Sequence, residues 1–369
     1  MNNSSRVFST ESDPRSDSHD DGRADDPVYG ALDLGTNNCR LLLAKKLINP
    51  ASPVISSFEV VDVYSRLVML GAGLDRSNML SREAILRCIS ALKVCAGKIA
   101  LHRPVAVRFV ATEACRQARN INSFMDQVWR ETGLELEVIS AAEEARLVFE
   151  ACIHLADPTL PYALIFDIGG GSTEILWIEI NQKRNSRLVD SISLPTGNLY
   201  RGLVDPKLAF KALDQTGFGL LRDQLLVALA DFERQHQIQD RIAAGMVQML
   251  GSSGTVTTLS AINLGLKRYD RSLVDNTRIS FAELQTIIGE ILLMNEADLV
   301  RHQIIGSGRS EFIVAGCAIV DALMTTWPVR EIIVADRGVR DGVILKLMNQ
   351  RLMTESLTIG HRTSTAPVV

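Results

Sequence analysis

The sequence lacks both an apolar run long enough to cross a membrane and a segment typical of an export signal. A transmembrane helix needs about 18 or more consecutive apolar residues, and no stretch approaches that length. Residues 1–27 contain no apolar core and no small-residue cleavage pattern, and their acidic residues argue against a transit peptide. We therefore expect neither secretion nor a membrane partner.

Cysteine and histidine are scarce and scattered along the chain. The six cysteines show no C-x-x-C spacing, and the six histidines do not cluster at the spacing of metal ligands. Most of the cysteines lie within apolar periodicity, where free thiols behave as small hydrophobic groups. The sequence therefore predicts no disulfide framework and no zinc site, and a reducing cytoplasm is the expected location.

Excess positive charge is also absent. The chain carries 39 basic and 43 acidic residues, a net charge of −4. Residues 1–27 hold seven of the acids and three of the arginines, so this segment accounts for the whole imbalance. We expect it to be a disordered tail, because it is too polar to offset the entropy of ordering. The balanced remainder predicts no specific nucleic-acid partner, and any polyanion must be bound at a local basic site.

A strand–turn–strand pattern occurs twice in the chain. Residues 28–47 and 163–178 each contain an apolar run ending in a carboxylate, a turn of glycine with small hydroxyl or amide residues, and a second apolar run. Asp33 and Asp167 occupy the same place in the two copies and lie 134 residues apart, about the length of one domain. The pattern predicts an internal duplication.

We therefore expect two domains of strands and helices between two polar ends. The predicted boundaries are 1–27 for the acidic tail, 28–158 and 159–350 for the domains, and 351–369 for a polar tail. The apolar patterns predict further strands near 58–64, 105–112, 134–140 and 331–336. They predict helices over 81–99, 143–155, 207–237, 281–294 and 312–325, a loop and helix over 251–262, and a closing helix from about 338.

The two glycine-rich turns have the composition of phosphate-binding loops. Because glycine has no side chain, backbone N–H groups can converge there on a phosphate. The aspartate that ends each first strand is a hard oxygen ligand, suited to a magnesium ion that also binds the phosphate. One D-x-G sequence is a common turn signal, but two copies in matching context predict phosphate binding.

Two further segments offer anion contacts, and each also has a purely structural explanation. Gly254 and Thr255 open a helix whose N–H groups could bind an anion, although a plain loop before a capped helix explains them at least as well. Arg116 follows a strand end and offers phosphate a planar fork of donors. Arg119 instead fits a solvated helix face.

Glu144 and Glu174 are the candidate carboxylates for water activation. Acids in the first turn of a helix, such as Glu143 and Glu144, are stabilising for structural reasons alone. Glu144 is favoured as a base because a phosphate site needs a water activator and no histidine is suitably placed. Glu174 could help to hold a metal-bound water near the second turn, and an outward-facing strand glutamate is the alternative.

Together these motifs resemble those of the exopolyphosphatase and guanosine pentaphosphate phosphohydrolase family. The matching segments are D-L-G-T-N-N-C-R-L-L (33–42), A-T-E-A-C-R-Q-A-R-N (111–120), E-E-A-R (143–146), D-I-G-G-G-S-T-E (167–174), L-P-T-G (194–197) and G-T-V-T-T-L (254–259). They cover nearly the whole expected folded region. The resemblance implies an α/β structure with the duplicated ribonuclease-H-like fold of actin-like ATPases, and an active site in the cleft between its two domains.

The resemblance also implies roles for residues of this chain. Glu144 is the implied catalytic glutamate, and Glu174 is the second essential carboxylate. Asp33, Asp167 and Glu174 are the implied ligands of Mg²⁺, for which Mn²⁺ can substitute, and K⁺ is a candidate monovalent ion. The implied phosphate-binding residues are Gly35, Thr36, Asn37, Asn38, Arg116, Gly169, Gly170, Gly171, Ser172, Thr173, Gly254 and Thr255. A homodimer is the candidate assembly.

The chain departs from the family pattern at three places. Serine is usual where Thr36 and Asn38 flank Asn37, glycines often stand at positions 252–253, and a histidine–glycine pair is common at positions 275–276. The last change bears on nucleotide or chain-length preference more than on the chemistry. Long members carry extra C-terminal helical domains, for which this chain is too short.

Three functions remain open at this point. The first is removal of terminal phosphate from inorganic polyphosphate, which is favoured, and the second is conversion of guanosine pentaphosphate to tetraphosphate. The third is a kinase or nucleotide sensor of the same fold, against which E-E-A-R and the presence of both Glu144 and Glu174 argue. In the favoured mechanism Glu144 deprotonates a water for in-line attack, while the glycine turns and Arg116 neutralise the phosphate.

Overall fold

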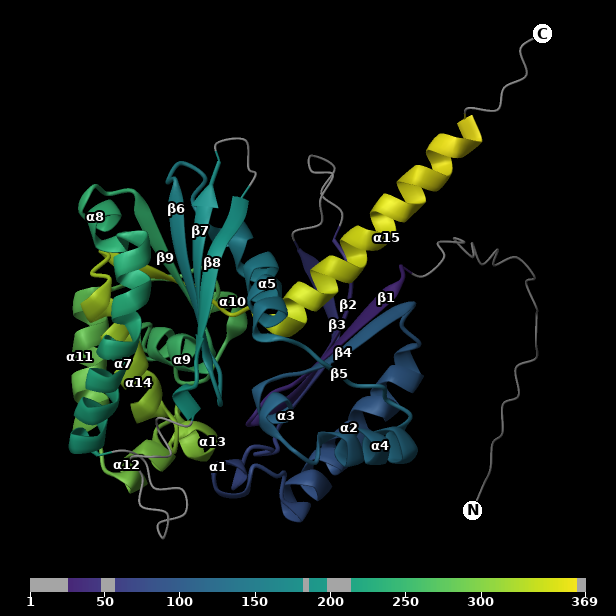
Figure 1. Cartoon of the computed structure of the whole chain (residues 1–369), viewed down its shortest axis with the longest axis horizontal. Helices are drawn as coiled ribbons and strands as arrows, with labels where there is room; N and C mark the ends of the chain where they lie inside the picture. The colour runs from purple at the N-terminus through teal and green to yellow at the C-terminus, as the bar shows by residue number, and fades with distance from the viewer. Residues whose placement is uncertain (1–25, 48–56, 182–185, 198–213, 364–369) are drawn as a thin grey trace, which may run out of the picture.

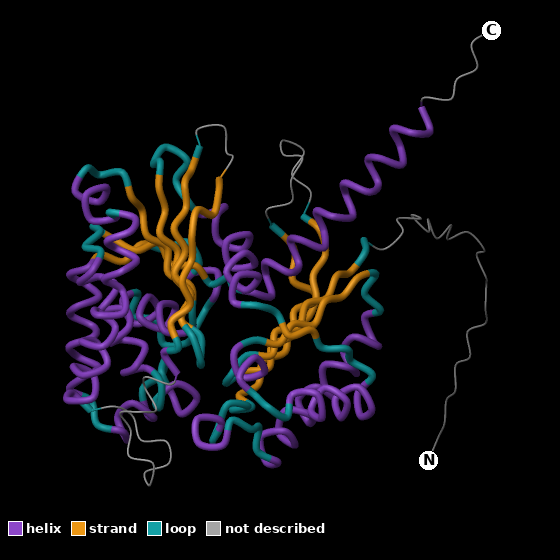
Figure 2. The backbone as a smooth tube through the Cα atoms, in the orientation of Figure 1, coloured by secondary structure: helices purple, strands orange, loops and turns teal. Residues whose placement is uncertain are grey.

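The computed structural model describes residues 26–47, 57–181, 186–197 and 214–363. They form two sheets that stand side by side, each with helices on its outer face, and two further helices lie between the sheets (Figure 1). Figure 2 shows the strands of each sheet as a separate layer inside the helices. The acidic tail expected over 1–27 lies outside the described residues, except for its last two positions. No helix within the described ranges has both the length and the apolar character that a membrane span requires.

The first sheet contains five strands in the order β3-β2-β1-β4-β5. They are β1 (Val28–Leu34), β2 (Asn38–Lys46), β3 (Phe58–Leu67), β4 (Ala106–Ala111) and β5 (Glu137–Val138). β2 runs antiparallel to β1 and β3, whereas β4 runs parallel to β1, and β5 parallel to β4. The segment 134–140, predicted as a full strand, pairs at two residues only. Its apolar side chains Leu134, Leu136 and Ile139 are nevertheless buried, which explains the strand-like pattern.

The second sheet repeats this arrangement and adds one strand. Its order is β10-β11-β9-β6-β7-β8. The strands are β6 (Tyr162–Ile168), β7 (Thr173–Ile180), β8 (Ser186–Leu194), β9 (Val247–Ser252), β10 (Arg278–Ser280) and β11 (Glu331–Ala335). The order and directions of the first sheet recur in the second, where β6, β7, β8, β9 and β11 correspond to β1, β2, β3, β4 and β5. The additional strand β10 pairs with β11 at the edge. The duplicated α/β fold is therefore confirmed.

The helices of the two halves occupy the connections between these strands. The first half contains α1 (Leu74–Ser77), α2 (Arg82–His102), α3 (Glu113–Gln117), α4 (Ile121–Thr132), α5 (Ala141–Cys152) and the 3₁₀ turn η1 (Ile153–Leu155). The second half contains α7 (Gln215–His236), α8 (Ile238–Ala243), α9 (Gly254–Asn263), α10 (Arg271–Val274), α11 (Phe281–Leu293), α12 (Glu296–Arg301), α13 (Gly306–Arg309), α14 (Ile313–Thr326) and α15 (Val339–Thr363).

Helix starts follow the capping residues of the sequence. The side chain of Ser81 accepts a hydrogen bond at the start of α2, and that of Ser140 does the same at the start of α5. α7 is described from Gln215, so the earlier part of the helix predicted over 207–237 lies outside the described residues. α15 begins one residue after position 338 and runs to Thr363, past position 351 where a polar tail is expected.

The apolar runs of β1 and β2 are continuous because both faces of the first sheet are buried. Leu41 and Leu43 point to the outer face and join the core formed with α2 and α4. Leu42 and Ala44 point to the inner face, toward α5 and α15. Alternate residues of a strand project to opposite faces, so a strand covered on both sides contains no regular polar positions. The second sheet has the same construction, with α7, α9, α11 and α14 in its outer core.

α5 and α15 fill the space between the two sheets, and each covers the sheet of the other half. α5 packs on β6, β7 and β8, while α15 packs on β1, β2 and β4 (Figure 1). The helices meet at Gly342, where a Cβ atom would overlap with the carbonyl oxygen of Leu147. Glycine permits this close approach of the two backbones. The two halves thus share one buried cluster.

Candidate active site

The two glycine-rich turns are closed by the same backbone hydrogen bond. In the turn between β1 and β2, the amide of Gly35 donates to the carbonyl of Asn38 at 2.9 Å. In the turn between β6 and β7, the amide of Gly169 donates to the carbonyl of Ser172 at 2.8 Å. The duplication therefore extends from the strands to the conformation of the turns.

The two turns also touch each other. A Cβ atom at Gly170 would lie 2.5 Å from Nδ2 of Asn37, and one at Gly171 would overlap with Oγ1 of Thr36. Neither glycine has a positive φ angle, so the reason for glycine here is space rather than backbone conformation. Segments 134 positions apart in the sequence thus form one surface.

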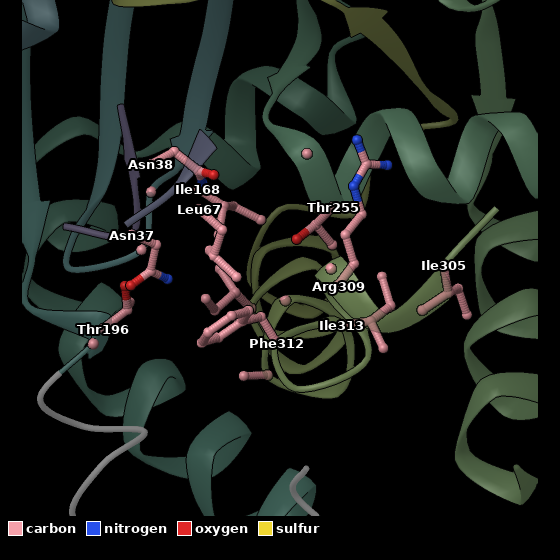
Figure 3. Close-up of a pocket in the computed structure, with 18 of the residues that line it drawn as sticks. Asn37, Asn38, Leu67, Ile168, Thr196, Thr255, Ile305, Arg309, Phe312 and Ile313 are labelled. Atoms are coloured by element: carbon pink, nitrogen blue, oxygen red, sulfur yellow. The ribbon is translucent and has the colours of Figure 1, made fainter. Parts of the chain in front are cut away.

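A cavity of about 400 Å³ lies between the two halves beside these turns (Figure 3). Six of the sequence-predicted phosphate-binding residues line it: Asn37, Asn38, Gly169, Gly170, Gly254 and Thr255. Asn37 and Asn38 lie across the cavity from Thr255 (Figure 3). The others are not among its lining residues: Gly35, Thr36, Arg116, Gly171, Ser172 and Thr173. The structure thus brings the third loop, whose role the sequence left open, to the same cavity as the other two.

Two arginines line this cavity that sequence reasoning did not select. Arg40 lies on β2, and Arg309 lies on α13. Arg309 donates to Oγ1 of Thr258, and its guanidinium stands 5.5 Å from the ring centre of Tyr269. The side chain of Arg40 makes no hydrogen bond or ion pair with a described residue, although its charge acts on Asp33 and Asp167. Arg40 stands within the segment D-L-G-T-N-N-C-R-L-L, so its motif offered a signal, whereas no motif marks Arg309.

The wall of the cavity on the side of α14 is apolar. It is lined by Leu67, Ile168, Leu221, Ile305, Phe312, Ile313, Ala315 and Ile319. Figure 3 shows Phe312 and Ile313 projecting from the start of α14 on the side of Arg309. The cavity therefore combines donors for an anion with a surface for an apolar group.

Glu144 and Glu174 are both buried, with exposed fractions of 7% and 1%. Glu144 lies in the first turn of α5, and Glu174 is the second residue of β7, directly after the second glycine turn. Oε1 of Glu174 accepts a hydrogen bond from Ser193 of β8 at 2.9 Å. Two carboxylates from different halves thus share a site with little water, where placing two negative charges is costly.

Arg116, predicted to contact phosphate, binds two carboxylates in this structure. Its Nη1 donates to Oε2 of Glu144 at 2.7 Å and to the carbonyl of Ile139 at 3.0 Å. Its Nε and Nη2 donate to Oε2 of Glu113, at 2.9 and 2.7 Å. With these contacts Arg116 fixes the position of Glu144.

The pKa values of the two glutamates are displaced upward. Burial raises the pKa of Glu144 to about 9, the Glu174 carboxylate adds to this rise, and Arg116 opposes it. Burial also raises the pKa of Glu174, against hydrogen bonds from Ser172 and Ser193 that lower it. Neither glutamate is among the residues that line the cavity, but displaced pKa values with an identified charge partner are typical of catalytic groups.

Asp33 and Asp167 end the first strand of each half and face similar surroundings. Burial raises the pKa of Asp33, and Arg40 opposes this rise. Burial raises the pKa of Asp167 to about 7, with a further rise from Glu174, and Arg40 again opposes it. The four carboxyl groups thus have too little nearby positive charge to be fully ionised together.

The donor set suits a hard divalent cation that also binds substrate. Among the described residues, no three carboxylate, histidine or cysteine side chains are close enough to enclose a metal ion. Magnesium, however, is usually bound by one or two carboxylates together with water and substrate phosphate. Asp33 and Asp167 meet that requirement, and the buried Oγ1 of Thr36 has no hydrogen-bond partner in the described structure. The residues therefore fit the magnesium ion that the sequence implies.

Two departures from the family pattern have structural explanations. Asn276 adopts a left-handed conformation with φ of 64°, which asparagine tolerates better than most residues other than glycine. Asp275 accepts hydrogen bonds from Arg337 at 3.1 and 3.2 Å and from the amide of Asp336 at 3.0 Å. Asp275 is not among the residues lining the cavity. Its contacts hold the connection between β11 and α15.

The loop before α9 also replaces glycine with serine. Ser253 has φ of 146°, a conformation that glycine adopts more easily, and its side chain accepts a hydrogen bond from the amide of Val256 at 3.2 Å. This contact caps α9 and compensates in part for the backbone strain. Ser252 donates through its hydroxyl to the carbonyl of Arg337, so it ties the same loop to the start of α15.

Comparison with known proteins gives a consistent set of relatives. The family model described as the Ppx/GppA phosphatase family matches residues 52–351. A guanosine-5'-triphosphate,3'-diphosphate pyrophosphatase of Aeromonas hydrophila is 25% identical over 323 residues, which cover 87% of this chain and 60% of that protein. The chain thus spans 60% of the length of the two Aeromonas relatives. An exopolyphosphatase 2 of Mycobacterium tuberculosis is 29% identical over 330 residues, covering 86% of this chain and 97% of that protein.

Solved structures with the same fold cover most of the chain. An exopolyphosphatase-like protein superposes with a TM-score of 0.75 at 25% identity, over 89% of this chain and 99% of that one. A PPX-GPPA enzyme of Aquifex aeolicus superposes with a TM-score of 0.68 at 24% identity, over 87% of this chain and 99% of that one. At 24% identity, the likeness to the Aquifex aeolicus enzyme supports the fold alone.

Proposed function

Because this chain belongs to the Ppx/GppA phosphatase family, we propose that it is a phosphoanhydride hydrolase that removes the terminal phosphate from inorganic polyphosphate. The observation that carries the proposal is the buried pair of Glu144, in the first turn of α5, and Glu174, directly after the second of two touching glycine turns. The polyphosphate substrate is supported by the exopolyphosphatase of Mycobacterium tuberculosis, which this chain matches over 97% of that protein's length.

In the proposed reaction Glu144 accepts the proton of the attacking water. Burial raises the pKa of Glu144, so its ionised form accepts a proton more readily than a carboxylate in water does. The ion pair with Arg116 at 2.7 Å supports the ionised form that a base requires. Arg116 therefore holds Glu144 in place and also offsets negative charge in the site.

The glycine turns and the cavity arginines bind the substrate. Phosphate oxygens bound at the turns of Asn37 and Gly170, which both line the cavity, would meet backbone N–H groups. The guanidinium of Arg40 makes no hydrogen bond with a described residue, so its donors can bind phosphate oxygens of the substrate. Positioning and charge stabilisation provide most of the acceleration in phosphoryl transfer, and both are supplied here by fixed groups.

Asp33 and Asp167 would hold Mg²⁺ or Mn²⁺ together with water and substrate phosphate, and Glu174 would act on the ion through a bound water. When bound, such a cation neutralises charge on the phosphate oxygens and lowers the pKa of a bound water. The chain itself supplies two strand-end carboxyls with raised pKa values, whose ionisation a nearby positive charge favours.

Guanosine pentaphosphate is the second candidate substrate, and the apolar wall of the cavity favours it. A polyphosphate chain has no group that gains from contact with Phe312 or Ile313, whereas a purine base does. The Aeromonas relatives named for a guanosine nucleotide give independent support. The same glutamate and the same turns would act on either substrate, because the bond cleaved is the same.

The two candidates are tested by timed phosphate release from polyphosphate and from guanosine pentaphosphate, measured side by side with the full chain and Mg²⁺. We expect the higher kcat/KM on polyphosphate. A higher kcat/KM on guanosine pentaphosphate would replace the first candidate by the second. Absence of phosphate release from both would refute the hydrolase itself.

A further inference from the structure

Glu143, the residue before the proposed base, is held by two cations from different elements. Nη1 of Arg108 on β4 donates to Oε1 of Glu143 at 2.9 Å, and Nζ of Lys346 on α15 donates to the same oxygen at 2.9 Å. Arg108 is fixed in turn by two hydrogen bonds to Glu137 of β5, at 2.9 and 3.0 Å. The first turn of α5 is therefore tied both to the first sheet and to the last helix of the chain.

The contact between Lys346 and Glu143 is in register with the closest backbone contact between the same helices. Leu147 stands one helical turn after Glu143, and Gly342 stands one turn before Lys346. Gly342 packs so closely on the carbonyl of Leu147 that no Cβ atom fits between them. Two successive turns of α5 thus meet two successive turns of α15, once by backbone contact and once by an ion pair. Sliding of one helix along the other would break both contacts.

We propose that Lys346 is a positioning residue for the hydrolysis, because its ion pair with Glu143 sets the place of Glu144 through the register of α5 and α15. The inference rests on the proposed role of Glu144 as the base. Glu144 and Glu143 are neighbours on α5, so a shift of the helix moves both carboxylates together. A displacement of about 1 Å at a reacting group can lower a rate by up to about 100-fold.

A merely structural role predicts a different result. The side chain of Lys346 is 40% exposed, and an ion pair of that exposure contributes about 0–1 kcal/mol to stability. Its loss would then leave the fold and the kinetic constants nearly unchanged. The positioning role instead predicts a fall in kcat without a matching fall in stability.

The test compares Lys346→Met, Lys346→Arg and a matched control, Lys93→Met. Lys93 forms an ion pair with Glu131 at 2.7 Å on the outer helices of the first half, away from α5. We expect Lys346→Met to lower kcat about tenfold with KM unchanged within about twofold, and Lys346→Arg to restore most of the loss. The Lys93→Met control should keep wild-type kcat, and all three variants should keep the wild-type Tm.

A kcat of Lys346→Met within about twofold of wild type would overturn the proposal. A loss that Lys93→Met reproduces, or that Lys346→Arg leaves unrestored, would also contradict it. Amide hydrogen exchange over residues 141–152 gives a readout that needs no activity: Lys346→Met should exchange faster there than wild type or the control. If wild-type protein releases no phosphate from either substrate, the proposed function fails. Unchanged exchange in α5 would then still refute the register role of Lys346.

Discussion

Arg40 and Glu174 occupy the same position in the two halves of the molecule. Arg40 pairs with Asp33 across β1 and β2, and Glu174 pairs with Asp167 across β6 and β7. The duplication therefore keeps the aspartate and changes the residue opposite it from a cation to a carboxylate. Burial and then Glu174 raise the pKa of Asp167, while Arg40 lowers it. One copy can thus attract a polyanion while the other supplies a carboxylate for the chemistry.

Replacing the proposed base should remove activity and leave the fold intact. We expect Glu144→Gln to lower kcat by about 10²–10⁴-fold, the usual contribution of a general base. Glutamine keeps the size of Glu144, and its amide oxygen can still accept the hydrogen bond from Arg116, so Tm should change little. Glu150→Gln, an exposed position on the same helix, is the control and should keep kcat. A Glu144→Gln protein that retains more than about a third of wild-type kcat would exclude the assignment.

Removal of divalent cations should stop phosphate release without unfolding the protein. The carboxylates of Asp33 and Asp167 are the oxygen ligands that magnesium and manganese prefer. Added Mg²⁺ should also raise the Tm of wild type, because a ligand that binds the folded state stabilises it. Asp33→Asn and Asp167→Asn should lose this Tm shift. Full activity in a chelator, with no Mg²⁺-dependent Tm shift, would contradict the metal roles.

The contact between the glycine turns can be tested by adding one methyl group. Gly171→Ala should collide with Thr36, displace the first turn and lower both kcat and Tm. Gly97→Ala in α2 is the control, since a Cβ atom there meets no atom within 4 Å. Replacing a helical glycine by alanine usually stabilises by about 1 kcal/mol, so Tm of the control should rise slightly. Wild-type kinetics in Gly171→Ala would show that the two turns need not touch.

The apolar wall gives a prediction that separates the two substrates. Phe312→Ala should raise KM for guanosine pentaphosphate about tenfold, because stacking of a base on an aromatic ring contributes about 1–3 kcal/mol. It should leave KM for polyphosphate unchanged. Steady-state kinetics on both substrates provide the measurement. Equal increases in KM for both substrates would show that Phe312 shapes the cavity without contacting a base.

The stability of the first half should depend on pH through Asp62 of β3. The hydrogen bond from Lys98 lowers the pKa of Asp62 most, and His102 adds a contact at 3.1 Å. Because the pKa of Asp62 is lower in the folded protein than in the unfolded chain, its ionised carboxylate stabilises the fold. This stabilisation is complete above about pH 3.9, the ordinary pKa of aspartate, and is lost as the pH falls through the pKa of the folded state. Asp62→Asn should therefore cost about 1 kcal/mol at pH 7. Denaturant unfolding at pH 7 and pH 3 tests this, and a difference that persists at pH 3 would contradict it.

Local patterns in the sequence predicted the features that depend on neighbouring residues. The repeated strand–turn–strand pattern gave the duplication, because strands and tight turns are encoded by apolar runs and glycine over a few positions. Ser81 predicted a helix start for the same local reason. The prediction of a full strand over 134–140 was wrong, because alternate side chains are buried there although only two residues pair with a neighbouring strand.

The partners of the charged groups were decided only by the tertiary structure. The ion pair of Arg116 with Glu144 spans 28 positions, and that of Lys346 with Glu143 spans 203. An arginine satisfies phosphate and carboxylate oxygens equally well, so composition could not show that Arg116 binds glutamates. By itself the sequence determined the duplicated fold and nominated its carboxylates, since these follow from local pattern. Packing between distant segments decided three other features. These are the placement of α5 and α15, each on the sheet of the other half, the contact of the two glycine turns, and the arginines that line the cavity.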